Sequence, residues 1–120
     1  GLIGSTAMEI TPVFNSLLAG NLLAPDRLAQ MLSGVPLPGS LDTGMVIASG
    51  MGVYTDQASK YGRNYHHGGG GPGYDLAAAV YPDTSLGRVA IAVFGDTSCG
   101  PRAETLKETL IYGLLGSSSL

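Results

Sequence analysis

The residues best suited to chemistry lie in one string, Tyr65-His66-His67-Gly68-Gly69-Gly70-Gly71-Pro72-Gly73-Tyr74. An imidazole has a reference pKa near 6.5, so it can accept or donate a proton at neutral pH. Glycines let a ligand or a second backbone approach closely, and Pro72 with the flanking tyrosines indicates an ordered path. The plain alternative is a flexible loop with an exposed histidine. The residue types alone leave both interpretations open.

Two nucleotide-binding motifs resemble the glycine string in part. A P-loop requires Lys and then Ser or Thr directly after its last glycine, but Tyr74 and Asp75 stand there. Gly68, Gly70 and Gly73 do match the spacing of the dinucleotide fingerprint, with Asp96 near the place of a ribose-binding acid. That fingerprint also requires a buried strand before it and a helix after it. The sequence predicts a polar run before and a strand after, so this alternative is disfavoured but open.

Hydrolase and metal interpretations depend on partners for the histidines. His67-Gly68-Gly69-Gly70 matches the oxyanion loop of lipase-like hydrolases, but no serine here stands in a Gly-x-Ser-x-Gly sequence. His66 and His67 are the only histidines, and neighbours in an extended segment point to opposite faces. Cys99, the only cysteine, cannot complete a zinc ligand set and is expected to be a small packed side chain. A Cys99–His67 nucleophilic pair is a minor alternative. We expect no metal and no cofactor.

The composition limits the classes of protein to consider. The 120 residues suffice for one domain, and an apolar content of 44% allows a buried core. Only 12% of residues are charged, which indicates that much of the surface faces other protein. A net charge of −3 gives no footprint for nucleic acid, and no apolar run approaches the roughly 20 residues of a membrane span. Because Gly1 is not an initiator Met, we expect a fragment or a cleavage product.

The first half of the chain is expected to be mainly helical. Thr6-Ala7-Met8-Glu9 fits a capping box and predicts a helix from about Thr6 to Ala19 that is kinked or shortened by Pro12 and ended by Gly20. The apolar spacing places one face toward the core, namely Ile10, Phe14, Leu17 and Leu18. A second short helix is predicted to begin at Pro25, and residues 34–44 are predicted to form a loop.

The second half is expected to be mainly strands. Residues 45–54 predict one or two strands, and residues 55–64 predict a polar surface connection. Residues 76–81 and 88–94, joined by a turn over 82–87, predict an antiparallel hairpin. A final helix is predicted to open at Pro101 and to end at Gly116. The expected fold class is α+β, an antiparallel sheet flanked by helices.

The segment from His67 to Tyr74 resembles the third motif of serine β-lactamases, DD-peptidases, D-aminopeptidases and related esterases. In the class C-like branch this motif is often H-x-G followed by G-x-P-G-aromatic, which matches residues 67–74. Residues 4–14, Gly-Ser-Thr-Ala-Met-Glu-Ile-Thr-Pro-Val-Phe, resemble the family's "STAxDLxxF" helix start, and residues 50–54 resemble its Y-G-L-G-aromatic strand. The resemblance implies that residues 1–120 are the carboxy-terminal portion of a β-lactamase/transpeptidase-like domain.

The chain departs from the family in its attacking groups. The family's nucleophile lies in S-x-x-K, but neither Lys60 nor Lys107 has a serine three residues before it. No asparagine completes the second motif, Y-x-N or S-x-N. Both motifs lie upstream in the family, so we expect the amino-terminal portion to be missing and this chain alone to be inactive. Gly68 replaces the usual threonine and so removes a hydroxyl for a substrate carboxylate, which weakens the case for a true β-lactamase.

The resemblance also implies roles and partners. The complete protein would be a serine acyl-enzyme hydrolase of small peptide, amide or ester substrates, with His67 positioning hydroxyls or passing a proton and the Gly70 N–H as an oxyanion donor. Gly68, Gly69 and Gly71 would line the substrate. The expected partner is the missing portion as a separate chain, or a second copy through an open sheet edge. Only the resemblance favours the cell envelope or secretion. A non-catalytic binding or scaffold module is the alternative from another class.

Overall fold

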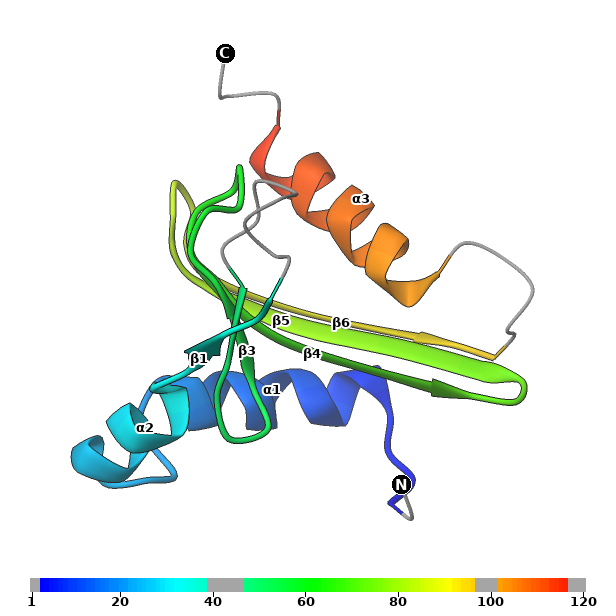
Figure 1. Cartoon of the computed structure of the whole chain (residues 1–120). Coiled ribbons are helices and arrows are strands. Elements are labelled where there is room, and N and C mark those ends of the chain that lie inside the picture. The colour runs from blue at the N-terminus through cyan, green and yellow to red at the C-terminus, as the bar shows by residue number, and fades with distance from the viewer. Residues whose placement is uncertain (1–2, 39–46, 97–101, 117–120) are drawn as a thin grey trace.

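The computed structural model describes residues 3–38, 47–96 and 102–116 (Figure 1). An open six-stranded antiparallel sheet is combined with three helices, so the predicted α+β class is confirmed. The strands are β1 (Val35–Pro36), β2 (Ile47–Ser49), β3 (Tyr54–Asp56), β4 (Asn64–Gly71), β5 (Tyr74–Thr84) and β6 (Gly87–Gly95). Their order in the sheet is their order in the sequence, which makes the sheet a meander.

Helix α1 (Ala7–Leu18) has the predicted boundaries for the predicted reasons. The Thr6 hydroxyl accepts from the Glu9 N–H at 3.3 Å, and the Glu9 carboxylate accepts from the Thr6 N–H at 3.0 Å, which is a capping box. At the other end Gly20, with φ +83°, donates its N–H to the Leu17 carbonyl in a Schellman-type cap. Pro12 lies inside the helix without ending it.

The other two helices complete three layers. Helix α2 (Pro25–Leu32) begins with Pro25 in its first turn, as predicted. Helix α3 (Ala103–Leu115) ends at Gly116, also as predicted. Helices α1 and α3 both pack on β5 and β6, and Figure 1 shows them on opposite faces of the sheet, with α2 beside the far end of α1. The predicted helix opening at Pro101 lies outside the described residues.

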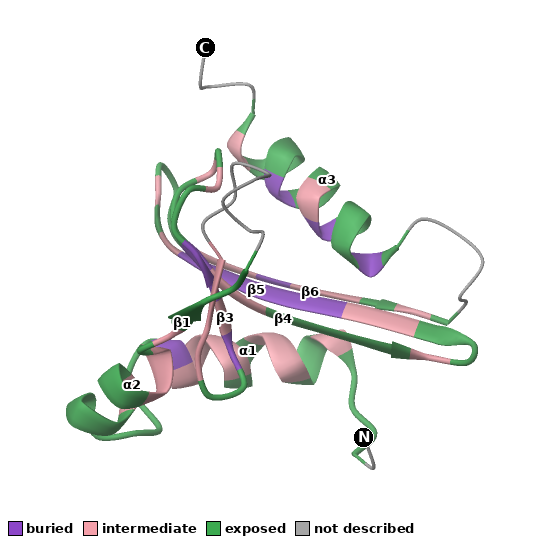
Figure 2. Ribbon diagram, viewed as in Figure 1, coloured by how far each residue is buried: buried purple, intermediate pink, exposed green. Residues whose placement is uncertain are grey.

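The core lies mainly between the sheet and α3, where the buried colour of Figure 2 is concentrated on β5 and α3. Its central cluster is Ala79, Tyr81, Ile91 and Ile111. Asp75, at the start of β5, accepts a hydrogen bond from the Ala103 N–H at 2.8 Å and so ties the beginning of α3 to the sheet. The helix is thereby fixed over the strand that neighbours the glycine string.

Three predictions about the connections were wrong. The predicted loop over 34–44 contains β1, because Val35 pairs with Ser49 and Pro36 with Ala48. The predicted surface connection over 55–64 begins and ends in strands, and its residues Thr55, Asp56 and Asn64 are buried. Asp56 lies opposite Asn64 in register, and its carboxylate accepts a hydrogen bond from the Ala58 N–H at 2.9 Å. The hairpin is longer than predicted, with β5 reaching Thr84 and β6 starting at Gly87.

Candidate active site

The glycine string forms strand β4, which has a free edge. On one side β4 pairs with β5 along residues 65–71. On the other side β3 pairs only with Asn64, Tyr65 and His66. Within the described part of the chain, no strand pairs with the outer edge of residues 67–71. Alternate residues of a strand point their N–H and C=O groups to each edge, so this stretch presents unpaired backbone groups.

Alternation along β4 places His67 and His66 on different faces of the sheet. His67 pairs with Ala78 and Gly69 pairs with Leu76. Because Ala78 and Leu76 line a cavity together with residues of α1, His67 and Gly69 lie on the α1 face. Residues 66, 68 and 70 therefore face α3.

A hollow of about 210 Å³ lies beside His67 between α1 and the sheet. Its lining is apolar apart from the imidazole and consists of Ile10, Val13, Phe14, His67, Leu76 and Ala78. The capping box and the glycine cap fix the ends of α1, so the helix wall is set by local sequence. The predicted inward face of α1 included Ile10 and Phe14, which do line this hollow, but it did not include Val13.

Tyr54 of β3 contacts both histidine rings at the point where β3 stops pairing with β4. Its ring stacks on His67, with centroids 5.4 Å apart and planes at 26°, and it lies 5.7 Å from the ring of His66. Aromatic contacts of this kind orient an imidazole without removing its hydrogen-bonding nitrogens. The role of Tyr54 was missed in the sequence, where the aromatic residue before the third motif was its only signal.

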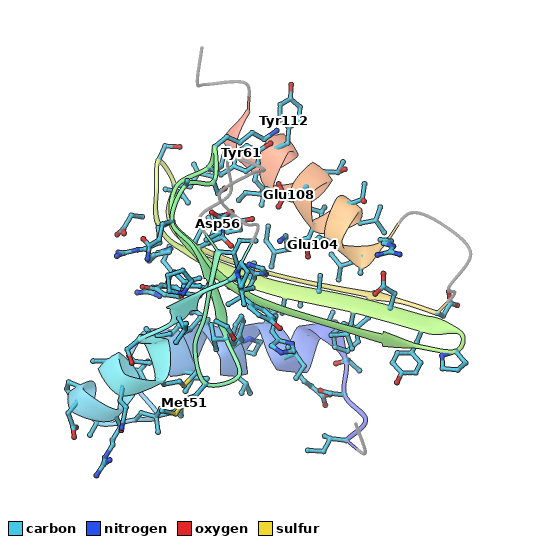
Figure 3. All side chains as sticks on the ribbon, in the orientation of Figure 1. Met51, Asp56, Tyr61, Glu104, Glu108 and Tyr112 are labelled. Atoms are coloured by element: carbon cyan, nitrogen blue, oxygen red, sulfur yellow. The ribbon has the colours of Figure 1, made fainter. Side chains whose placement is uncertain are left out.

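His66 has a different environment on the α3 face. Burial lowers the pKa of His66 below its ordinary value, and the positive charge of Lys107 lowers it further. Lys107 is itself buried and forms ion pairs with Glu104 and Glu108. Figure 3 shows Glu104 and Glu108 on α3 with Asp56 on the same side of the sheet. His66 therefore belongs to a partly buried polar cluster on the α3 face and not to the free edge.

The glycines of β4 differ in how far the fold requires them. None of them has a positive φ, so their backbone conformation is open to other residues. A methyl group at Gly69 would meet the Leu76 side chain at 3.7 Å, which is an ordinary contact. At Gly68 and Gly70 it would lie 3.3 Å from a backbone or carboxylate oxygen, and at Gly71 it would lie 2.7 Å from the Tyr74 ring. The fold itself does not explain why residue 69 lacks a side chain.

The structure thus brings all five predicted site residues, 67–71, onto one strand with an accessible edge. It removes the dinucleotide alternative, because β4 is followed by a tight turn with Gly73 at φ +80° and by strand β5 instead of a helix. Cys99 lies outside the described residues. Among the residues that are described, no three His, Cys, Asp or Glu side chains come together as a possible metal site.

No protein-family model matches this chain, no curated protein matches it, and no solved structure matches it. None of the helices in the described ranges has the length and apolar character needed to cross a membrane. The family relationship that the motifs indicate therefore stays a prediction.

Proposed function

We propose that this chain supplies one wall of the active site of a serine acyl-enzyme hydrolase, of the type to which β-lactamases, DD-peptidases and D-aminopeptidase-like esterases belong. The observation that carries the proposal is the free edge of β4, where His67 is followed by four residues without side chains. Glycines weaken a strand, so four in a row reduce the stability of β4. We take this loss of stability as a sign that the bare edge has a function.

The substrate is proposed to lie along this edge as an additional strand. An extended peptide, amide or ester can exchange backbone hydrogen bonds with residues 67–71, as ligands do in β-augmentation. Without side chains at residues 68–71, the substrate's own groups can lie over the faces of the sheet beside this edge. On the pattern of the resembling family, the Gly70 N–H is one oxyanion donor and the attacking serine provides the other. Loss of one such donor typically costs about 3 kcal/mol of transition-state stabilisation.

His67 is proposed to serve the attacking hydroxyl. It stands at the start of the free edge, is exposed, and is oriented by the Tyr54 ring. In the complete enzyme it would position the serine hydroxyl or pass its proton. We predict that His67→Ala lowers the acylation rate by about 10²-fold or more, in line with typical general acid–base contributions. Stopped-flow acylation with an ester substrate measures this, and an unchanged rate would make His67 a structural residue.

The nucleophile must come from outside these 120 residues, since no S-x-x-K sequence is present. The first experiment is to identify every polypeptide in a preparation of the protein and to treat it with a labelled fluorophosphonate. A second polypeptide that carries S-x-x-K and becomes labelled supports the proposal. Labelling that needs no such polypeptide, or its absence when that polypeptide is present, contradicts it. Labelled penicillin, used in parallel, tests the narrower assignment as a β-lactamase.

The chain alone is predicted to associate. The outer edge of residues 67–71 is unpaired in the described structure, and exposed strand edges recruit other strands. We expect either a complex with the nucleophile-bearing chain or self-association, measured by analytical ultracentrifugation over a hundredfold range of concentration. A monomer at every concentration, with a cooperative thermal transition, would contradict this expectation.

A binding or scaffold module without chemistry is the second candidate. It is favoured by the absence of S-x-x-K in this sequence, combined with an edge that is suited to strand addition. The fluorophosphonate experiment separates the two candidates, since a scaffold binds its partner without becoming labelled in any component.

A further inference from the structure

The lining of the hollow beside His67 favours apolar groups over charged ones. Five of its six lining side chains contain only carbon and hydrogen beyond the backbone, and no carboxylate, ammonium or guanidinium group lines it. A charged group placed there would lose its hydration without gaining a counter-charge, which is strongly unfavourable. An apolar group would exchange water for contact with Phe14, Leu76 and their neighbours, which is favourable.

The size of the hollow fits a side group and not a whole peptide. At about 210 Å³ it is somewhat larger than an engineered apolar cavity of about 150 Å³ that holds benzene. Ala78 contributes to this space because its methyl group leaves room where a larger residue would fill the gap between α1 and β5. A phenyl ring or a branched aliphatic chain matches this volume.

The hollow is also connected to the free edge. His67 lines it, and Gly69, the next residue of β4 on the same face, is exposed and has no side chain. A methyl group at Gly69 would be tolerated by its neighbours, so the bare surface there is not imposed by packing. A group seated in the hollow can therefore be joined over Gly69 to a chain that lies along residues 67–71.

We infer that the substrate is an ester or amide that bears an uncharged aromatic or branched aliphatic group, and that this group binds in the hollow formed by α1 and β5 beside His67. This inference rests on the proposed function, which it deepens by naming the substrate class. The selecting residues are Val13 and Phe14 of α1 and Leu76 and Ala78 of β5. His67 lies between this specificity pocket and the edge where the bond is cleaved.

The test uses the full chain, isotopically labelled, and follows the binding of two uncharged probes by NMR. The probes are racemic N-acetylphenylalanine methyl ester and N-acetylalanine methyl ester. We expect the phenylalanine ester to shift the Val13 and Ala78 methyl signals and the His67 ring signals. It should bind about tenfold or more tightly than the alanine ester, because the ring buries several additional apolar carbons.

The decisive variant is Val13→Trp, which fills the hollow from a position on α1 that is 56% exposed and therefore tolerant of a larger side chain. It should abolish the preference for the phenyl group. Leu110→Trp is the matched control, since Leu110 is 49% exposed on α3, on the other face of the sheet, and should leave binding unchanged. Equal binding of the two esters, or shifts confined to the surface where Lys60 lies 5.9 Å from the ring of Tyr112 on α3, would overturn the inference.

The two proposals fail in different ways. If the phenylalanine ester binds the hollow but no component of the preparation reacts with fluorophosphonate, the acyl-transfer proposal fails and the hollow remains a site for small apolar groups. If labelling succeeds but the alanine ester binds as tightly, only the substrate inference fails. Loss of the ester shifts when the nucleophile-bearing polypeptide is added would show that a side chain of the partner fills the hollow, which also overturns the inference.

Discussion

Replacing Lys107 by methionine and, separately, by alanine distinguishes the packing of this residue from its charge. Lys107 lies on α3 and is only 2% exposed, so its aliphatic stem is part of the interior. Its Nζ forms ion pairs with Glu104 and, at 3.3 Å, with Glu108. The two glutamate side chains remain 51% and 45% exposed, so each can turn to solvent when the lysine is removed.

The expected magnitudes follow from these exposures. Alanine removes three buried methylenes, worth about 0.8 kcal/mol each, and leaves a cavity, so Lys107→Ala should cost about 3 kcal/mol of unfolding free energy. Methionine keeps most of the buried volume. The methionine variant lacks the ion pairs with half-exposed partners, which stabilise by about 0.5–1 kcal/mol. It also avoids the unfavourable burial of a charge, which acts in the opposite direction. Lys107→Met should therefore lie within about 1 kcal/mol of the parent protein.

The assay is urea unfolding followed by far-UV circular dichroism at one fixed protein concentration, because association contributes to apparent stability. Lys60→Met and Lys60→Ala form the matched control pair, since Lys60 is exposed and the two variants should differ little. Equal destabilisation by Lys107→Met and Lys107→Ala would refute the reasoning, because it would mean that the ion pairs outweigh the packing of the stem.

Two further predictions concern residues on the face of the sheet that α3 covers. Tyr81 is completely buried, and its hydroxyl has no hydrogen-bond partner among the described residues. Tyr81→Phe should therefore raise the unfolding free energy, measured by urea titration, by about 1 kcal/mol. A decrease of similar size would mean that the hydroxyl has a partner. Burial lowers the pKa of His66 in the folded state, so protonation favours unfolding. The full stability is present above the pKa of the unfolded state, which is near 6.5. It should fall as the pH falls from there through the pKa of the folded state. The slope cannot exceed about 1.4 kcal/mol per pH unit for one proton. His66→Gln should remove this slope below about pH 6.5 and His67→Gln should keep it; equal slopes in both variants would assign the pH dependence to other groups.

Local signals made the helices and the hairpin predictable. Thr6 and Glu9 determine the start of α1 through bonds within four residues, and Gly20 determines its end. The turn between β5 and β6 is equally local. None of these elements depends on a distant partner, which explains why sequence patterns located them within a few residues.

The missed features depend on register and distant contacts. Asp56 and Asn64 have the polarity of a surface loop, and only their pairing across β3 and β4 makes them interior residues. The burial of Lys107 likewise depends on where α3 meets the sheet. For the candidate site, His67 and the glycines were predictable from residue type, but the stacking of Tyr54 and the hollow lined by Val13 require knowledge of which elements meet.

The meander order of the sheet has a consequence for the sequence of events in folding. Every strand pairs with its neighbour in the chain, so each pairing closes only a short loop, and such local pairings form early. Helix α1, by contrast, docks on β5 and β6 from more than fifty residues upstream. The free edge of β4 can therefore exist before the hollow does, and the pocket that we assign to substrate selection is completed only when this distant helix packs on the sheet.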